Sequence, residues 1–322
     1  MAQRVWLSGV SSVTHLVHAA SWLRTQSDVT LVDLGSRSFL GRRNVTEQDV
    51  LAWLPADLAR DRGRGAGPDE RLTYLAIGAP GLKPWARLRA AHPGRRLRVV
   101  VVDEGLGSYG DWRARRDASA REGGGRLWPT VRARAVATGS NLLTDERWAL
   151  YREQAGGWVV DPQVAAEFRR DLVPVADRSR AVLLTQPWAE LGILDAEQVG
   201  TALREAARQC ERAGLDLLVR PHPAELAPGQ HGVATDPGRG PAELDPRVVG
   251  AAVVLGTAST ALLNLRALHG TPALRISLPG VDEVDACLSP RQRSLLDTWL
   301  PAPVALAELS RAITDLPYHR ST

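Results

Sequence analysis

The sequence predicts an α/β protein with two doubly wound domains, each built on a parallel sheet. Short apolar runs alternate with helical patterns from the start of the chain, and the same alternation begins again after residue 180. Four consecutive valines at residues 99–102 are apolar on both faces, as expected of a strand between two layers of helices. A chain of 322 residues is long enough for two such domains.

The first domain is predicted to span residues 1–175. Its strands are expected at residues 5–10, 29–34, 72–77 and 97–102. Residues 105–150 fit the alternation poorly, because they contain several tryptophans, many arginines and a run of three glycines. We expect irregular or helical cover there.

The second domain is predicted to span residues 176–322, after charged residues interrupt the pattern near 170–180. Its strands are expected at residues 181–185, 215–219, 251–255 and 273–276. A helix from Val199 carries apolar residues at the three-and-four spacing of a buried stripe, which includes Cys210. Cys210 is therefore predicted to be a core residue.

Composition excludes several classes of protein. Hydrophobic residues make up 44% and charged residues 24%, which is ordinary for a globular chain. No apolar run approaches the roughly 18 residues of a membrane helix, and residues 1–10 lack a signal pattern, so we expect a cytoplasmic protein. Cys210 and Cys287 are too few for a disulfide framework and lack metal-ligand spacing, so no metal site is expected.

The net charge of +4 does not predict nucleic-acid binding. Lys83 is the only lysine, so 39 of the 40 basic residues are arginine, which indicates coding bias rather than a basic face. Residues 83–134 contain 13 basic and 5 acidic residues, a net charge of +8. This region could attract an anionic ligand, or be a solvated arginine-rich surface.

Ligands of open α/β sheets bind beyond the carboxyl ends of the strands, so the polar residues that follow each apolar run are candidates for chemistry. Asp103 and Glu104 follow the four valines and precede Gly105. A carboxylate there could act as a general base toward a hydroxyl group. Alternatively, one acid caps a helix or pairs with an arginine.

A second strand end is Arg220-Pro221-His222-Pro223, where two prolines restrict the backbone around one histidine. The imidazole could donate a hydrogen bond or a proton to a leaving phosphate, and Arg220 could supply a fixed charge for the same anion. The alternative is a histidine that makes ordinary turn hydrogen bonds.

A third strand end is Gly256-Thr257-Ala258-Ser259-Thr260, which leads into a helical run. Backbone N–H groups and hydroxyl groups at the start of a helix suit a phosphate. Simple capping of the helix by Ser259 or Thr260 is the alternative, and capping and phosphate binding can coexist.

Together and in this order, the acidic-acidic-Gly, His-Pro and Ser-Thr motifs resemble those of the bacterial sialyltransferases and polysialyltransferases. Gln186-Pro187 after the strand at 181–185 adds to the likeness, as do Ser11 and Ser12 after the first strand. The resemblance spans nearly the whole chain and depends on about fifteen residues.

The resemblance implies a GT-B glycosyltransferase, with two Rossmann-like domains that face a central cleft and a CMP-activated sugar as donor. It implies inverting chemistry with no metal or other cofactor. Glu104, or else Asp103, would deprotonate the acceptor hydroxyl, and His222 would hydrogen-bond or protonate the departing phosphate.

The same resemblance divides the remaining candidates between the two substrates. The nucleotide side would comprise Gln186, Arg220, His222, Pro223, Gly256, Thr257, Ser259 and Thr260. The acceptor side would comprise Ser11, Ser12 and Gly105. Gly256-Thr257 replaces the bulkier residues that often precede the Ser-Thr pair, and residues 105–150 have no counterpart, so the sugar and the acceptor stay open.

Two alternatives remain at this point. One is a transferase or epimerase of the same architecture that uses a UDP-sugar or CDP-glycerol. The other is a nucleotide- or sugar-binding protein without catalytic activity. A preference for cytidine nucleotides over uridine nucleotides separates a UDP-sugar enzyme from a CMP-sugar enzyme, and binding without turnover identifies the second alternative.

Overall fold

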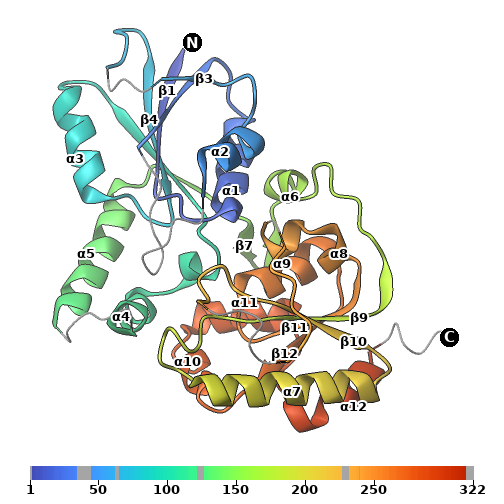
Figure 1. The fold of residues 1–322 in the computed structure, drawn as a ribbon. Helices are drawn as coiled ribbons and strands as arrows, with labels where there is room; N and C mark the ends of the chain where they lie inside the picture. The colour runs from blue at the N-terminus through green and yellow to red at the C-terminus, as the bar shows by residue number, and fades with distance from the viewer. Residues whose placement is uncertain are drawn as a thin grey trace. The chain divides into compact units, whose positions relative to one another are not determined.

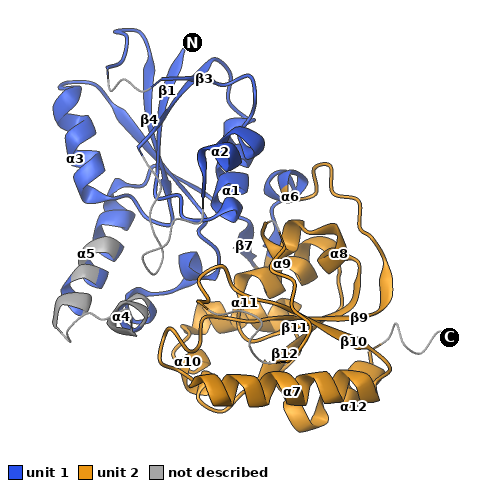
Figure 2. Cartoon of the chain, in the orientation of Figure 1, with its two compact units in different colours: residues 1–154, 159–167 blue, residues 155–158, 168–322 orange. Residues whose placement is uncertain are grey.

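The protein is described by a computed structural model that covers residues 2–34, 45–61, 65–121, 127–226, 232–238 and 240–316. The chain divides into two compact units, shown in Figure 2. The first unit comprises residues 1–154 and 159–167, and the second comprises residues 155–158 and 168–322. Each unit contains one main parallel sheet, so the predicted α/β class with two Rossmann-like domains is confirmed.

The sheet of the first unit has the strand order β3-β2-β1-β4-β5-β6, and all of its neighbouring strands are parallel. The order along the sheet reverses between β1 and β4, which makes their carboxyl ends the topological switch point where ligands of this architecture bind. The strands are β1 (Gln3–Ser8), β2 (Val29–Asp33), β3 (Ala59–Arg60), β4 (Arg71–Ile77), β5 (Leu97–Val102) and β6 (Glu146–Trp148).

Helices cover both faces of this sheet, with α1 and α2 on one side and α3 and α5 on the other (Figure 1). All four valines of β5 are buried, as their double-sided apolar character predicted. The elements outside the sheet are α1 (Val13–Leu23), α2 (Glu47–Trp53), α3 (Leu82–Ala91), η1 (Leu106–Tyr109), α4 (Trp112–Arg121), α5 (Leu127–Leu143) and α6 (Pro162–Phe168).

The core of the first unit follows the strand alternation. Trp6 of β1 and Tyr74 of β4 are fully buried in one cluster with Leu88 of α3. Leu7 points to the opposite face, because successive side chains of a strand alternate, and it is 1% exposed. The sheet is therefore filled by apolar side chains on both faces.

The sheet of the second unit has the order β10-β9-β11-β12-β13, again with parallel pairing throughout. Its order reverses between β9 and β11, so the second switch point lies at their carboxyl ends. The strands are β9 (Asp177–Leu184), β10 (Asp216–Arg220), β11 (Ala251–Gly256), β12 (Ala273–Ser277) and β13 (Val304–Ala305).

Two layers of helices cover this second sheet, with α7 and α12 on one side and α8, α9 and α11 on the other (Figure 1). Cys210 is fully buried in the cluster of α7, β9 and β11, so its predicted core position is confirmed. The elements outside the sheet are α7 (Ala196–Arg212), η2 (Ala242–Leu244), α8 (Pro246–Val249), α9 (Thr260–His269), α10 (Val281–Asp285), α11 (Pro290–Trp299), η3 (Leu306–Glu308) and α12 (Leu309–Thr314).

All eight strands predicted from apolar runs are present, with ends that differ by a few residues. The strands missed by the sequence are short ones: β3, β6, β13 and the separate pair β7 (Tyr151–Gln154) and β8 (Gly157–Val160). Residues 105–150 form η1, α4 and α5, as the expected helical cover, and also contribute β6. Among the helices of the described residues, none has the length and apolar character needed to cross a membrane.

Candidate functional site

Glycines with positive φ follow three neighbouring strands at the carboxyl edge of the first sheet. Gly9 after β1, Gly78 after β4 and Gly105 after β5 have φ of 88°, 70° and 106°. At Gly78 the requirement is also steric, since a Cβ there would lie 2.1 Å from Oε2 of Glu104. The absence of a side chain at Gly78 is what leaves room for the Glu104 carboxylate.

Asp103, the first acid of the predicted pair, is only 6% exposed. Its carboxylate accepts hydrogen bonds from the hydroxyl of Tyr109 and from the backbone N of Leu150, the latter at 2.8 Å. Burial raises the pKa of Asp103 to about 7, although these two hydrogen bonds act to lower it. The Asp103 side chain therefore links β5 to η1 and to the segment after β6, so its contacts stabilise the fold.

Glu104, the second acid, is exposed. Its backbone is fixed on both sides, since its N donates to Oγ of Ser108 at 2.9 Å and its carbonyl accepts from Nε2 of His15 at 3.2 Å. The carboxylate lies beside Gly78 at the sheet edge. Of the two acids, Glu104 is the one placed to meet a hydroxyl group from outside.

The predicted serines lie on the neighbouring turn between β1 and α1. Ser12 caps α1 by accepting from the N of His15, and the N of Ser11 donates to Nδ1 of His15 at 3.2 Å. With Nδ1 accepting, the ring proton is on Nε2, which is the atom bonded to the Glu104 carbonyl. His15 was missed by the sequence analysis, although its position three residues after a helix cap could have identified it.

The second unit brings two of the predicted motifs to its switch point. Gln186-Pro187 follows β9, and residues 256–260 run from the end of β11 into α9. We call residues 256–260 the phosphate loop, after the role that the sequence predicts for them. Ser259 caps α9 by accepting from the N of Leu262 at 3.1 Å, so the predicted capping is present. Thr257 and Ser259 are buried, whereas Thr260 is half-buried at the first position of the helix.

Asp285 of α10 also belongs to this region, because its carboxylate accepts a hydrogen bond from the backbone N of Ala258 in the phosphate loop. Burial raises the pKa of Asp285, and that hydrogen bond opposes the rise. No motif in the sequence pointed to Asp285, since it lies more than twenty residues after the loop it contacts.

His222 lies in a turn, residues 222–225, that is held by its own hydrogen bonds. The N of Ala224 donates to Nδ1 of His222 at 3.1 Å, and the N of His222 donates to Oε1 of Glu225 at 2.7 Å. Thr185, at the end of β9, donates its hydroxyl to the same Glu225 oxygen. The turn is thereby tied to the switch point, and Glu225 is a third residue, after His15 and Asp285, that the sequence analysis missed.

The electrostatic state of His222 follows from these contacts. Burial lowers its pKa, and the nearby Glu190 carboxylate opposes that effect. Because Nδ1 accepts a backbone N–H, the proton of the neutral ring is on Nε2. His222 is therefore suited to donate a hydrogen bond from Nε2 rather than to carry a positive charge, while Pro223 beside it is exposed.

Arg220 is directed elsewhere. Its guanidinium group, 6% exposed, donates to Asp245 at 3.1 Å and to the carbonyl of Gly240 at 2.6 Å. It lines a separate cavity together with residues of β9 and α8, and none of the other predicted nucleotide residues is among the lining residues of that cavity. The structure thus brings Gln186, the phosphate loop and the His222 turn to one sheet edge, and gives Arg220 a structural ion pair.

The part of the chain that the structure describes contains no group of three or more His, Cys, Asp or Glu side chains arranged to hold a metal ion.

The chain is similar to several solved structures over almost its whole length. Spinosyn forosaminyltransferase SpnP is 13% identical, with 99% of this chain and 92% of that chain covered and a TM-score of 0.48. The glycosyltransferase SnogD from Streptomyces nogalater is 14% identical, with the same two coverages and a TM-score of 0.48. The UDP-GlcNAc 2-epimerase of Methanocaldococcus jannaschii is 9% identical, with 99% and 100% covered and a TM-score of 0.41.

No protein family model matches the chain, and no curated protein sequence matches it. None of the three similar structures is a sialyltransferase by name, so the resemblance to that family stays a prediction. The assignment of two Rossmann-like units depends on the strand orders of the two sheets.

Proposed function

We propose that the protein is a metal-independent, inverting glycosyltransferase of the GT-B type that uses a nucleotide-activated sugar. The observation that carries this proposal is the switch point between β9 and β11, where Gln186, the phosphate loop and the turn of His222 meet at one sheet edge. Backbone N–H groups, hydroxyl groups and a neutral histidine there are all hydrogen-bond donors, which is what a phosphate requires.

In the proposed reaction, Glu104 takes the proton of the acceptor hydroxyl while the acceptor oxygen attacks the anomeric carbon of the donor. The new C–O bond forms as the bond from that carbon to the phosphate oxygen breaks, so the anomeric configuration inverts. His222 donates a hydrogen bond from Nε2 to the phosphate oxygen that leaves, and Ser259, Thr260 and the N–H groups at the start of α9 bind the rest of the phosphate.

The exposed Glu104 carboxylate supports the role of base, because its backbone is fixed by His15 and Ser108 while its side chain is exposed at the sheet edge. Ser11, Ser12 and Gly105, which lie on the turns after β1 and β5, are proposed to border the acceptor. Asp103 is proposed to hold the turn after β5 through its contacts with Tyr109 and Leu150.

The donor nucleotide is the finer part of the proposal. The three sequence motifs favour CMP, and a nucleoside diphosphate such as UDP or dTDP is the alternative. Turnover is measured separately as release of product, since a binding protein without catalytic activity would bind the nucleotide and release no product.

A nucleotide panel tests nucleotide binding and the choice of donor. Thermal shift with CMP, CDP, UMP, UDP and dTDP should show stabilisation by one nucleotide class, about 2.7 kcal/mol when the ligand is at about 100 times its dissociation constant. CMP or CDP is expected to give the largest shift, and a larger shift with UDP or dTDP would replace the CMP donor by a diphosphate sugar. No shift with any nucleotide would overturn the proposed function itself.

A further inference from the structure

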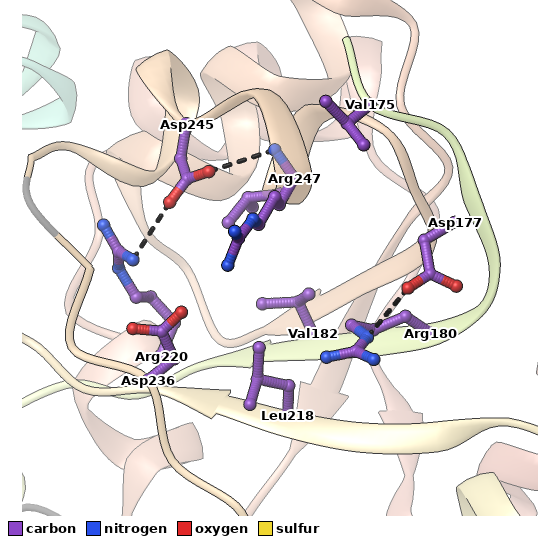
Figure 3. Close-up of a pocket in the computed structure, with 10 residues that line it drawn as sticks. Val175, Asp177, Arg180, Val182, Leu218, Arg220, Asp236, Asp245 and Arg247 are labelled. Atoms are coloured by element: carbon purple, nitrogen blue, oxygen red, sulfur yellow. Dashed lines mark hydrogen bonds and ion pairs between the residues drawn. The ribbon is translucent and has the colours of Figure 1, made fainter.

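A cavity of about 260 Å³ lies on one face of the second sheet, over the edge strand β10 and its neighbour β9 (Figure 3). We call it the β10 cavity. Its lining residues come from the segment before and within β9, from β10, from the loop that follows and from α8. They are Val175, Asp177, Arg180, Val182, Leu218, Arg220, Asp236, Asp245, Arg247 and Val248.

The floor of the cavity is apolar. Val182 and Leu218 are register partners on the parallel strands β9 and β10, so their side chains lie next to each other on the same face. Val182 is fully covered, whereas Leu218, on the edge strand, is only half-buried. An apolar group placed on Leu218 would be removed from water, which is favourable in proportion to the apolar area that it covers.

One wall is fixed by buried polar contacts. The Arg220 guanidinium binds Asp245, which also caps α8 by accepting from the backbone N of Arg247 at 3.0 Å. Gly238 is necessary for this arrangement, since a Cβ there would lie 1.4 Å from Nη1 of Arg220. The start of α8, which carries Arg247, is therefore anchored to the end of β10.

The charges of the lining differ in how they are satisfied. Arg220 pairs with Asp245, and Nε of Arg180 pairs with Asp177 at 3.0 Å. Asp236 accepts a hydrogen bond from the backbone N of Gly238. The guanidinium group of Arg247 forms no ion pair with a carboxylate among the residues that the structure describes, and Figure 3 shows this group extending from α8 into the cavity.

From this geometry we infer that the β10 cavity binds a small organic carboxylate whose apolar part lies on Val182 and Leu218. Its carboxylate pairs with Arg247, which offers planar N–H groups that match a carboxylate in a bidentate manner. Arg180 also lines this space, and its ion pair with Asp177 is made through Nε. Asp236 lies in the loop that follows β10 and would repel a second anionic group of the ligand there.

The site is independent of the proposed transfer reaction. The ten lining residues include no residue of the phosphate loop or of the His222 turn. Binding at the β10 cavity can therefore be tested whether or not the protein transfers a sugar.

The test uses benzoate as the probe, with benzamide as a neutral molecule of the same shape and inorganic phosphate as an anion without an apolar part. Isothermal titration of the full chain should detect benzoate binding. Benzamide and phosphate should each bind with an affinity at least about tenfold lower. Arg247→Gln should weaken benzoate binding by about tenfold or more. Arg212→Gln, at an exposed arginine of α7 in the same unit, removes the same charge and should leave binding unchanged.

Two further measurements locate the site. Leu218→Phe should reduce benzoate binding by filling the floor, and saturating CMP should not compete with benzoate. Equal binding of benzoate by wild type and Arg247→Gln would overturn the inference, as would competition by CMP or the absence of benzoate binding at millimolar concentration.

Discussion

The backbone carbonyl of Glu104 accepts a hydrogen bond from Nε2 of His15 at 3.2 Å, across 89 residues of sequence. This bond joins the turn after β1 to the turn after β5, two strands that are separated in the sheet by β4. His15 in turn is oriented by the N of Ser11. The position of Glu104 is therefore set by the loop that the sequence analysis assigned to the acceptor side.

Glu104→Gln should abolish transfer and leave the nucleotide dissociation constant nearly unchanged. The amide keeps the shape of the side chain and removes the base, which typically contributes about 100-fold to 10,000-fold in rate. Asp103→Asn should affect transfer less, because Asp103 is buried against Tyr109 and Leu150. Transfer rates and nucleotide affinities of both variants check this, and an inactive Asp103→Asn beside an active Glu104→Gln would reverse the two roles.

Asp103 should also make the stability of the protein depend on pH. Its pKa is about 7 in the folded chain against an ordinary value of 3.8, so between these pH values the folded protein keeps a proton that the unfolded chain has lost. The stabilisation is full below pH 3.8 and is lost as the pH rises through about 7.

Melting temperatures of wild type and Asp103→Asn between pH 4 and pH 8 measure this effect. The advantage of wild type over the variant should be largest at the acidic end and should decline toward about pH 7. Two melting curves that stay parallel over the whole range would show that Asp103 does not titrate in this window.

Gly78→Ala should reduce transfer by displacing the Glu104 carboxylate. The new Cβ would lie 2.1 Å from Oε2 of Glu104, and a displacement of about 1 Å at a reacting group can cost about 100-fold in rate. Gly94→Ala is the matched control, since Gly94 has a similar φ of 75° and no atom near its Cβ position. Both variants should lose about 1 kcal/mol of stability, and equal transfer rates in the two would contradict the placement of Glu104.

His222→Ala should lower donor turnover by about 100-fold while the melting temperature changes little. One hydrogen-bond donor to the leaving phosphate disappears, and a single donor of this kind is worth about 100-fold to 1,000-fold. The fold loses the acceptor for the N of Ala224. Turnover and melting temperature are measured on the same preparation; a fully active variant would remove His222 from the phosphate site, and an unfolded one would show that its role is structural.

Ser259→Ala combined with Thr260→Ala should weaken CMP binding more than cytidine binding, because only CMP carries the phosphate. Ser259 also caps α9, so the variant should lose about 1 kcal/mol of stability. Ser289→Ala is the matched control for this loss of stability, since Ser289 caps α11 by the same type of hydrogen bond, from the N of Gln292. It should destabilise the protein similarly without changing CMP affinity, and equal losses for CMP and cytidine in the double variant would exclude the phosphate contact.

The sequence alone determined the architecture and which strand ends are followed by polar candidate residues. Apolar runs such as residues 99–102 identify buried strands because burial on both faces leaves no polar position, and this signal is local. The short strands β3, β6 and β13 have two or three residues each, too few for any periodicity. They could be found only through their pairing with longer neighbours.

What each candidate side chain does was decided by the tertiary structure. Asp103 and Glu104 are adjacent acids in the sequence, but one is buried against Tyr109 and Leu150 and the other is exposed beside Gly78. Arg220 and His222 are two residues apart, yet the first binds Asp245 and the second lies in a turn held by Glu225. Partners such as Leu150 for Asp103 and Asp245 for Arg220 are distant in the sequence, and only the folded chain brings these groups together.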